Sequence, residues 1–325
     1  MRVLVTGGNR YIGLSLVFEL ARRGHEVTVA NSHEAPLPDG ARRIHVDRRI
    51  PGALVEALGP HRDAFDAVFD NTAFTVADVE PMIELFDGRL QHYVFTSSMA
   101  VYRRSFVQPV REHFRTHDPG DDDPRKAYGV NKVRCERLLR ERFERTGFPA
   151  TTFRVSHTIG PRSPLPTREP VYFARLEQRR PIPVPAEGFP FVSLIHVDDA
   201  ATLLASTLGC AVAPGRIYNA TGPEVTSIAG AVHLMAHAVG VEPHLVHVPM
   251  EIARSLRHPL VHWGEGIMGG AIFSMDEVHR DLDWTPRFGL EDGYRDAYEW
   301  FRAGGRAQYT FDFSADDELL TRLGR

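Results

Sequence analysis

The residues with the clearest chemistry are Tyr128 and Lys132, which stand four positions apart at the start of a helical pattern. On a helix this spacing puts the phenol and the ammonium on one face, one turn apart. A nearby ammonium favours the phenolate, so the pair predicts a tyrosine whose pKa is lowered from its usual value of about 10. Such a tyrosine can act as a general acid or base. The Ser97-Ser98 pair, earlier in the chain, supplies a hydroxyl for the same substrate oxygen.

A glycine-rich turn near the N-terminus indicates a phosphate-binding site. It reads Thr-Gly-Gly-Asn-Arg-Tyr-Ile-Gly from Thr6 to Gly13, directly after an apolar run. Glycine permits the tight turn, and the N-terminus of the next helix offers N–H groups and a positive dipole to a pyrophosphate. Arg10 replaces the usual middle glycine and offers a cation for a phosphate. The residues expected to bind a dinucleotide here are Gly7, Asn9, Arg10, Tyr11, Ile12 and Gly13.

The choice between NAD and NADP stays open in the sequence. An acidic residue usually ends the second strand and holds the adenosine ribose, but here the chain reads Asn31, Ser32 and His33. An amide can bond to hydroxyls and does not repel a 2′-phosphate as a carboxylate does. Asp47, after the third strand, is placed to accept from the adenine amino group, or else to cap the next helix.

Strand and helix patterns alternate along the first half of the chain. Strands are expected at 3–6, 25–30, 43–46, 67–69, 92–95 and 150–155, with helices at 11–23, 51–57, 76–87 and 124–146 between them. This alternation predicts a Rossmann-type, doubly wound α/β fold with a mostly parallel sheet. We expect residues 1–160 to form the NAD(P)-binding domain, with returning segments near 192–213 and 271–285.

The second half of the chain differs from the first in composition. Prolines cluster between 161 and 190, which favours irregular, substrate-facing structure over sheet. Further helices are expected at about 198–208, 227–239 and 290–302. We expect residues 161–325 to form mainly a smaller substrate-binding domain.

Bulk properties exclude several classes of protein. The 325 residues carry a net charge of −4, so no basic excess favours non-specific binding to nucleic acid. Cys135 and Cys210 are the two cysteines and lie far apart, which predicts no disulfide framework and a cytoplasmic location. No apolar run reaches the roughly 20 residues of a membrane span. His233 and His237 have an i, i+4 spacing, but their apolar neighbours indicate packing, and we expect no metal.

Several motifs together resemble the extended short-chain dehydrogenase/reductase family. They are the glycine-rich turn, Ser-Ser-x-x-Val-Tyr, Tyr-x-x-x-Lys, Ile-His-Val-Asp-Asp-Ala at 195–200, Tyr-Asn-Ala-Thr-Gly at 218–222 and Asp-Leu-Asp-Trp-Thr-Pro at 281–286. The likeness covers roughly residues 1 to 303. Its best-known members are NAD-dependent epimerases and dehydratases of nucleotide sugars. The form of the turn also resembles a sub-branch that includes the chloroplast stem-loop-binding proteins.

The resemblance assigns roles to individual residues. Ser98 matches the catalytic serine or threonine, Tyr128 the proton-transfer residue, and Lys132 the residue that binds the nicotinamide ribose and tunes Tyr128. Hydride passes between a carbinol carbon and the nicotinamide while Tyr128 moves the hydroxyl proton. The further residues implied at the cofactor are Thr72, Ala73 and Thr96.

Departures from the family pattern narrow the reaction. Dehydratases carry an Asp-Glu pair after the catalytic Ser/Thr, where this chain has Met99 and Ala100, so elimination of water is disfavoured. His157 stands where an asparagine often contacts the sugar nucleotide. An arginine that grips the diphosphate usually precedes the Ile-His-Val-Asp segment and is missing. The residues that could replace it are Arg162, Arg168, Arg175 and Arg216. The expected substrate-binding residues are Ser98, Met99, His157 and Arg162.

These observations favour an NAD(P)-dependent epimerase or oxidoreductase acting on a sugar-like carbinol, with a nucleotide sugar as the expected form. An NADPH-dependent reductase or dehydrogenase of a biosynthetic intermediate is the alternative, and an RNA-binding protein on the same scaffold is a third. The expected partner is a small molecule, with neither nucleic acid nor membrane. A homodimer is expected through the helices at 76–87 and 125–146, with Leu138, Leu139 and Phe143 at the contact.

Overall fold

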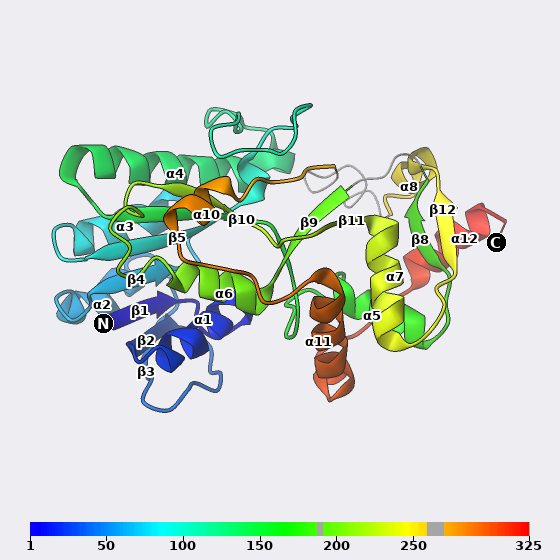
Figure 1. Ribbon diagram of the computed structural model, residues 1–325, viewed down its shortest axis with the longest axis horizontal. Coiled ribbons are helices and arrows are strands. Elements are labelled where there is room, and N and C mark those ends of the chain that lie inside the picture. Colours follow the sequence, from blue (N-terminus) through cyan, green and yellow to red (C-terminus); the bar gives the residue numbers. More distant parts are fainter. Residues whose placement is uncertain (187–190, 259–269, 325) are drawn as a thin grey trace.

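A seven-stranded parallel sheet forms the larger half of the molecule (Figure 1). The computed structural model describes residues 1–186, 191–258 and 270–324. In spatial order the strands are β10 (Ile217–Ala220), β6 (Ala150–Val155), β5 (His92–Ser98), β4 (Ala67–Asp70), β1 (Arg2–Thr6), β2 (Glu26–Asn31) and β3 (Arg42–His45). This order reverses between β1 and β4, which is the arrangement of a doubly wound fold. The predicted fold class is confirmed.

Side chains alternate between the two faces of the sheet, and each face is covered by helices. On β1, Val3 and Val5 belong to the core under α1 (Tyr11–Arg22) and α6 (Val197–Ala205). Leu4 points the other way, into a second core. The helices over that second face are α2 (Ala53–Leu58), α3 (Val76–Phe86) and α4 (Ala127–Thr146). Short 3₁₀ turns are η1 (Gly59–His61), η2 (Met99–Val101), η3 (Pro124–Lys126) and η4 (Gly305–Gln308).

A smaller lobe contains the remaining strands and most of the C-terminal helices (Figure 1). Its strands are β7 (His157–Ile159), β8 (Ile182–Pro185), β9 (Phe191–His196), β11 (Val225–Ser227) and β12 (Leu245–Val248). Its helices are α5 (Glu169–Glu177), α7 (Ile228–Val239), α8 (Met250–Ser255), α11 (Leu290–Arg302) and α12 (Ser314–Arg322), while α10 (Asp276–Asp281) lies beside β10. None of the helices in the described ranges combines the length and apolarity needed to cross a bilayer.

The proline-rich segment contains more regular structure than its composition predicts. Pro183 and Pro185 lie within β8, which pairs in parallel with β12 as one of only two strands in its sheet. Each strand of a two-stranded sheet has one free edge, and a proline without an N–H is tolerated there. The expectation of irregular structure at this point is therefore wrong.

The residues expected at a dimer contact pack within their own chain. Leu139 is buried in the core under α4, and Leu138 is partly buried against the same core. Phe143 lies over Gly215, where an added Cβ would approach its ring to 2.3 Å. The exposed residues of α4 are mostly charged: Arg134, Arg137, Arg140, Glu141, Glu144 and Arg145. Leu139 is therefore not available to a partner chain, while the homodimer and the part of Leu138 and Phe143 in it stay predictions.

A buried ion pair holds α4 against the ends of β5 and β6. The Glu136 carboxylate accepts from Arg154 at 2.7 Å and from the Ser97 hydroxyl at 2.5 Å. Both charged side chains are 5% exposed. The Arg154 guanidinium also lies over the Tyr102 ring, 4.6 Å from its centroid. An ion pair with this little solvent is costly to break on one side only, because a buried charge is left without a partner.

We predict that Glu136→Ala lowers the free energy of unfolding by about 3–5 kcal/mol, since it leaves Arg154 buried and uncompensated. The measurement is chemical denaturation of both proteins. Glu141→Ala, at an exposed position of the same helix, is the control and should change the value by less than about 0.5 kcal/mol. Equal losses in the two variants would contradict this role for the pair.

Candidate active site

The glycine-rich turn is packed so closely that its glycines are required. Gly7 has φ +71°, and an added Cβ would lie 2.2 Å from the Thr72 methyl carbon. A Cβ on Gly13 would lie 2.2 Å from the Gly7 carbonyl oxygen. This contact brings the first turn of α1 onto the end of β1, as a phosphate-binding turn requires.

A cavity of about 420 Å³ lies beside this turn, at the carboxyl ends of β1, β2 and β4. Its lining includes seven of the predicted cofactor residues: Gly7, Asn9, Arg10, Asn31, Ser32, Asp47 and Thr72. Sequence segments that are up to 65 residues apart therefore meet at one site, as the family resemblance implies. A ligand-sized cavity at the point where strand order reverses is the usual place for a dinucleotide.

Three other predicted residues of the turn do not line this cavity. Tyr11 is buried with φ +48°, and its hydroxyl donates to the Thr158 carbonyl at 2.6 Å. Ile12 packs against the core under α1, and Gly13 gives the turn its close approach. Tyr11 thus links the glycine-rich turn to β7 of the smaller lobe.

An ion pair that the sequence analysis missed joins Arg48, which lines the cavity, to a buried carboxylate behind it. The Asp70 carboxylate is fully buried and lies 2.5 Å from the Arg48 guanidinium. Burial by itself raises the pKa of Asp70, but Arg48 and hydrogen bonds from Thr6 and Tyr93 outweigh burial and hold the pKa at about 2. Asp70 also accepts from the backbone N–H of Thr72. In the sequence, the available sign of this ion pair was Asp70, a carboxylate at the end of an apolar strand.

The residues present fit a bound dinucleotide. Asn31 is 7% exposed, lines the cavity, and has neither side-chain amide atom hydrogen-bonded among the described residues. A ligand with hydroxyl or phosphate oxygens would satisfy such groups. Asp47 accepts from the Arg49 guanidinium at 2.6 Å, and α2 is capped by Gly52, so Asp47 is not the helix cap.

The three residues of the predicted catalytic set meet at the edge of this cavity. Ser98 ends β5 and Tyr128 lies in the first turn of α4, where the Ser98 side chain is close enough to the phenol to lower its pKa. The Tyr128 ring lies 6.2 Å from the ring of Phe74, which lines the cavity. Tyr128 is 48% exposed as a residue, so a substrate can reach it, while the protein atoms around its hydroxyl still displace part of the water there.

Lys132 is buried and donates to two backbone carbonyls. Its ammonium lies 2.8 Å from the Ala73 oxygen and 2.7 Å from the Thr96 oxygen. It also lies 4.7 Å from the Phe95 ring centroid and 6.0 Å from that of Tyr128. Burial without an adjacent carboxylate lowers the pKa of Lys132 to about 8.

The prediction that Lys132 lowers the pKa of Tyr128 is wrong for this structure. Burial of the phenol raises the pKa of Tyr128, while Ser98 and the charge of Arg168 lower it in part. Lys132 does not contribute because its ammonium is turned toward the carbonyls of Ala73 and Thr96. Ala73 and Thr96, both predicted at the cofactor, thus contact Lys132 of the predicted catalytic set, but neither lines the cavity beside the glycine-rich turn.

The four predicted substrate residues lie in different places. Ser98 stands beside Tyr128, but the Met99 side chain is fully buried in a core cluster with Val101 and Tyr102. Arg162 lies against α1 and α6, with its guanidinium 3.3 Å from the Ser15 hydroxyl and 4.0 Å from Asp198. The side chain of Met99 is therefore unavailable to a substrate, and Arg162 lines neither cavity described for this chain.

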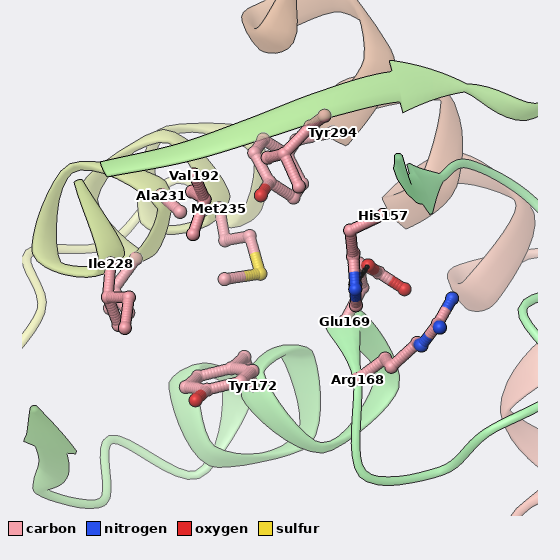
Figure 2. Close-up of a pocket in the computed structure, with 11 residues that line it drawn as sticks. His157, Arg168, Glu169, Tyr172, Val192, Ile228, Ala231, Met235 and Tyr294 are labelled. Atoms are coloured by element: carbon pink, nitrogen blue, oxygen red, sulfur yellow. Dashed lines mark ion pairs between the residues drawn. The ribbon is translucent and has the colours of Figure 1, made fainter. Parts of the chain in front are cut away.

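His157 lines a second, much smaller cavity of about 30 Å³ in the smaller lobe. Figure 2 shows His157, Glu169 and Arg168 together on one side, with Tyr172, Met235 and Tyr294 around the rest. The His157 imidazole and the buried Glu169 carboxylate are 3.6 Å apart. Other walls come from apolar residues: Val192, Leu194, Ile228, Ala231 and Val232. The sequence analysis missed Glu169, whose burial depends on contacts between lobes of the chain that no local pattern reveals.

The four arginines that could replace the missing diphosphate-binding arginine have different surroundings in the structure. Arg175 is paired with Asp316 and Arg216 lies 3.8 Å from Asp281. Arg168 is partly exposed, lines the cavity of His157, and lies near enough to Tyr128 for its charge to lower the pKa of that phenol. Of the four, Arg168 is the one that lines the cavity of the smaller lobe and whose charge also acts on Tyr128.

Comparisons with known proteins agree with this geometry. The chain is 28% identical to the chloroplast stem-loop binding protein of 41 kDa b from Arabidopsis thaliana, over 99% of this chain and 84% of that protein. It is 26% identical to the 2'-dehydrokanamycin reductase of Streptomyces kanamyceticus, over 78% of this chain and 71% of that protein. The UDP-glucose-4-epimerase of Stenotrophomonas maltophila, solved with bound NAD, shares the fold with a TM-score of 0.76 at 21% identity, covering 94% of this chain and 99% of that one.

A family model covers the sheet, the glycine-rich turn and the predicted catalytic residues. It is described as the NAD dependent epimerase/dehydratase family and matches residues 3–221. The resemblance drawn from the sequence motifs is thereby confirmed. Since the match spans more than half of the chain, the protein belongs to the NAD dependent epimerase/dehydratase family.

Proposed function

We propose that this protein is an NAD(P)-dependent epimerase or related oxidoreductase that acts on a carbinol carbon of a sugar-like substrate, in the form of a nucleotide sugar. The observation that carries the proposal is the meeting of Ser98, Tyr128 and Lys132 at the edge of the cofactor cavity. A hydroxyl, an exposed phenol and a buried ammonium beside a dinucleotide site support hydride transfer with proton transfer.

Each residue has a separate task in this chemistry. Tyr128 moves the proton of the substrate hydroxyl, and Ser98, close to the phenol, bonds to the same oxygen. Lys132 is held between the cofactor cavity and Tyr128, where its ammonium can bind a ribose hydroxyl. When bound, the nicotinamide ring accepts and returns the hydride. The raised pKa of Tyr128 keeps the phenol protonated at neutral pH, which suits donation to a carbonyl oxygen.

The environment of Ser98 supports epimerisation or simple oxidoreduction over dehydration. Met99 and Ala100, the next two residues, have no group that transfers a proton, and Met99 is also buried. Elimination of water needs an acid and a base at adjacent carbons. Epimerisation needs only return of the hydride to the other face of the carbonyl carbon.

A second candidate is a net reductase or dehydrogenase of a biosynthetic intermediate. Val192 and Leu194, which directly precede the Ile-His-Val-Asp segment, form apolar walls of the cavity in the smaller lobe, and the reductase from Streptomyces is a relative. Apolar walls favour a substrate with less charge than a diphosphate. An RNA-binding role has support only in the name of the Arabidopsis relative and in the exposed arginines of α4.

We expect the purified protein to interconvert epimers in a panel of UDP-, GDP- and ADP-sugars without added stoichiometric cofactor. Tyr128→Phe should lower turnover by about 10²- to 10⁴-fold, the usual contribution of general acid–base catalysis, and should leave dinucleotide binding unchanged. Product analysis by nuclear magnetic resonance and calorimetric binding are the measurements.

Tyr298→Phe, on α11, removes a phenolic hydroxyl elsewhere and is the control. A demand for one equivalent of cofactor per turnover would favour the reductase instead. Full activity of Tyr128→Phe would contradict both the epimerase and the reductase function.

Arg168 should tune the proton affinity of Tyr128. Its positive charge stabilises the phenolate, so Arg168→Met should raise the pKa of Tyr128 further. The measurement is the alkaline difference absorbance of tyrosinate, with Tyr128→Phe as the reference that isolates this phenol. Arg162→Met is the control, because the Arg162 guanidinium lies at Ser15, and it should leave the pKa of Tyr128 unchanged. A titration that moves to lower pH in Arg168→Met would contradict the assignment.

A further inference from the structure

The wall of the cofactor cavity contains an amide at the place where a carboxylate usually holds the adenosine ribose. Asn31 ends β2, its side chain is buried, and neither amide atom has a hydrogen-bond partner among the described residues. An unsatisfied buried polar group is unfavourable, and a ligand able to bond with the amide would remove that cost. The amide also carries no negative charge that would repel a phosphate.

The charges around Asn31 leave one cation uncompensated. Arg48 is bound by Asp70, and Arg49 is bound by Asp47. Arg10, in the glycine-rich turn, is exposed and has no carboxylate within 4.0 Å in the part of the chain that the structure describes. Arg10, Arg48 and Arg49 line the cavity together with the carboxylate residues Asp47 and Asp78, the second of which lies 3.9 Å from Arg48. Arg10 is therefore the arginine of this lining that is left without a carboxylate partner among the described residues.

The residues after Asn31 are also suited to an anion. The Ser32 hydroxyl lies 2.9 Å from Nδ1 of His33, and both residues line the cavity. The next carboxylate along the chain, that of Glu34, is 90% exposed, lies 3.9 Å from Arg43 and does not line the cavity. A phosphate here would therefore meet a guanidinium, an amide and a hydroxyl, which are typical donors for its oxygens.

We propose that this end of the cavity binds the 2′-phosphate of an adenosine ribose, so that the protein selects NADP over NAD. Arg10 pairs with the phosphate, and Asn31 and Ser32 bond to its oxygens. The inference rests on the proposed function only in placing a dinucleotide in this cavity. It differs from the cofactor of the Stenotrophomonas epimerase, whose structure contains NAD.

The sharpest test uses fragments that differ only in the phosphate. Isothermal titration calorimetry should show adenosine 2′,5′-bisphosphate binding at least about tenfold more tightly than adenosine 5′-monophosphate, a difference of about 1.4 kcal/mol. NADPH and NADH should differ in the same direction. The preference should weaken as ionic strength rises, because the phosphate contact is an ion pair at a partly open site.

Variants then identify the residues responsible. Arg10→Ala should reduce the NADPH to NADH affinity ratio to about one by weakening NADPH alone, since its exposed side chain makes no contact needed for folding. Asn31→Asp should reverse the preference through repulsion of the phosphate. Arg62→Ala removes an exposed guanidinium before β4 and is the control, with the ratio unchanged.

Two results would overturn the inference. One is equal or tighter binding of NADH by the unaltered protein, which leaves the proposed enzymatic function intact. The other is an equal loss of both dinucleotides in Arg10→Ala. Binding of neither dinucleotide would overturn the proposed function as well as this inference.

Discussion

Two buried charged side chains, Lys132 and Glu136, fix the position of α4 on the sheet, and the placement of the proposed catalytic residues depends on it. Tyr128, Lys132 and Glu136 follow one another at intervals of four, so they form one stripe on the helix. Glu136 is bonded to Ser97 and Arg154, and Lys132 to the Thr96 carbonyl. Because two of the three residues are tied to the end of β5, the third is held beside Ser98.

The same burial that fixes the helix sets the proton affinities of the site. Lys132 has carbonyl oxygens and ring faces around its ammonium but no carboxylate beside it, and its pKa falls to about 8. The pKa of Tyr128 rises through loss of water, and the partners that oppose the rise are Ser98 and Arg168. The pKa of the Tyr128 phenol therefore depends on Ser98 at the end of β5 and on Arg168 just before α5, in addition to its own helix.

The two lobes present different surfaces to a ligand. The cofactor cavity is lined by arginines that are paired with Asp70 and Asp47, except for Arg10, whereas the cavity of the smaller lobe is mostly apolar. Tyr11 connects the lobes, because it belongs to the glycine-rich turn and donates to the Thr158 carbonyl on β7. A hydrogen bond therefore joins the glycine-rich turn to the strand that begins with His157.

The amino-acid sequence by itself determined the parallel sheet, the order of strands and helices in its first half, and the identity of Ser98, Tyr128 and Lys132 as neighbours. These follow from local periodicity, glycine positions and fixed spacings, which do not depend on how individual side chains pack. The tertiary structure alone decided which way the Lys132 ammonium points, that Met99 is buried, that Leu139 belongs to the core, and that the charge of Arg168 acts on Tyr128. Direction and burial of a side chain depend on neighbours that are distant in the chain, and the electrostatic character of a group follows from that environment.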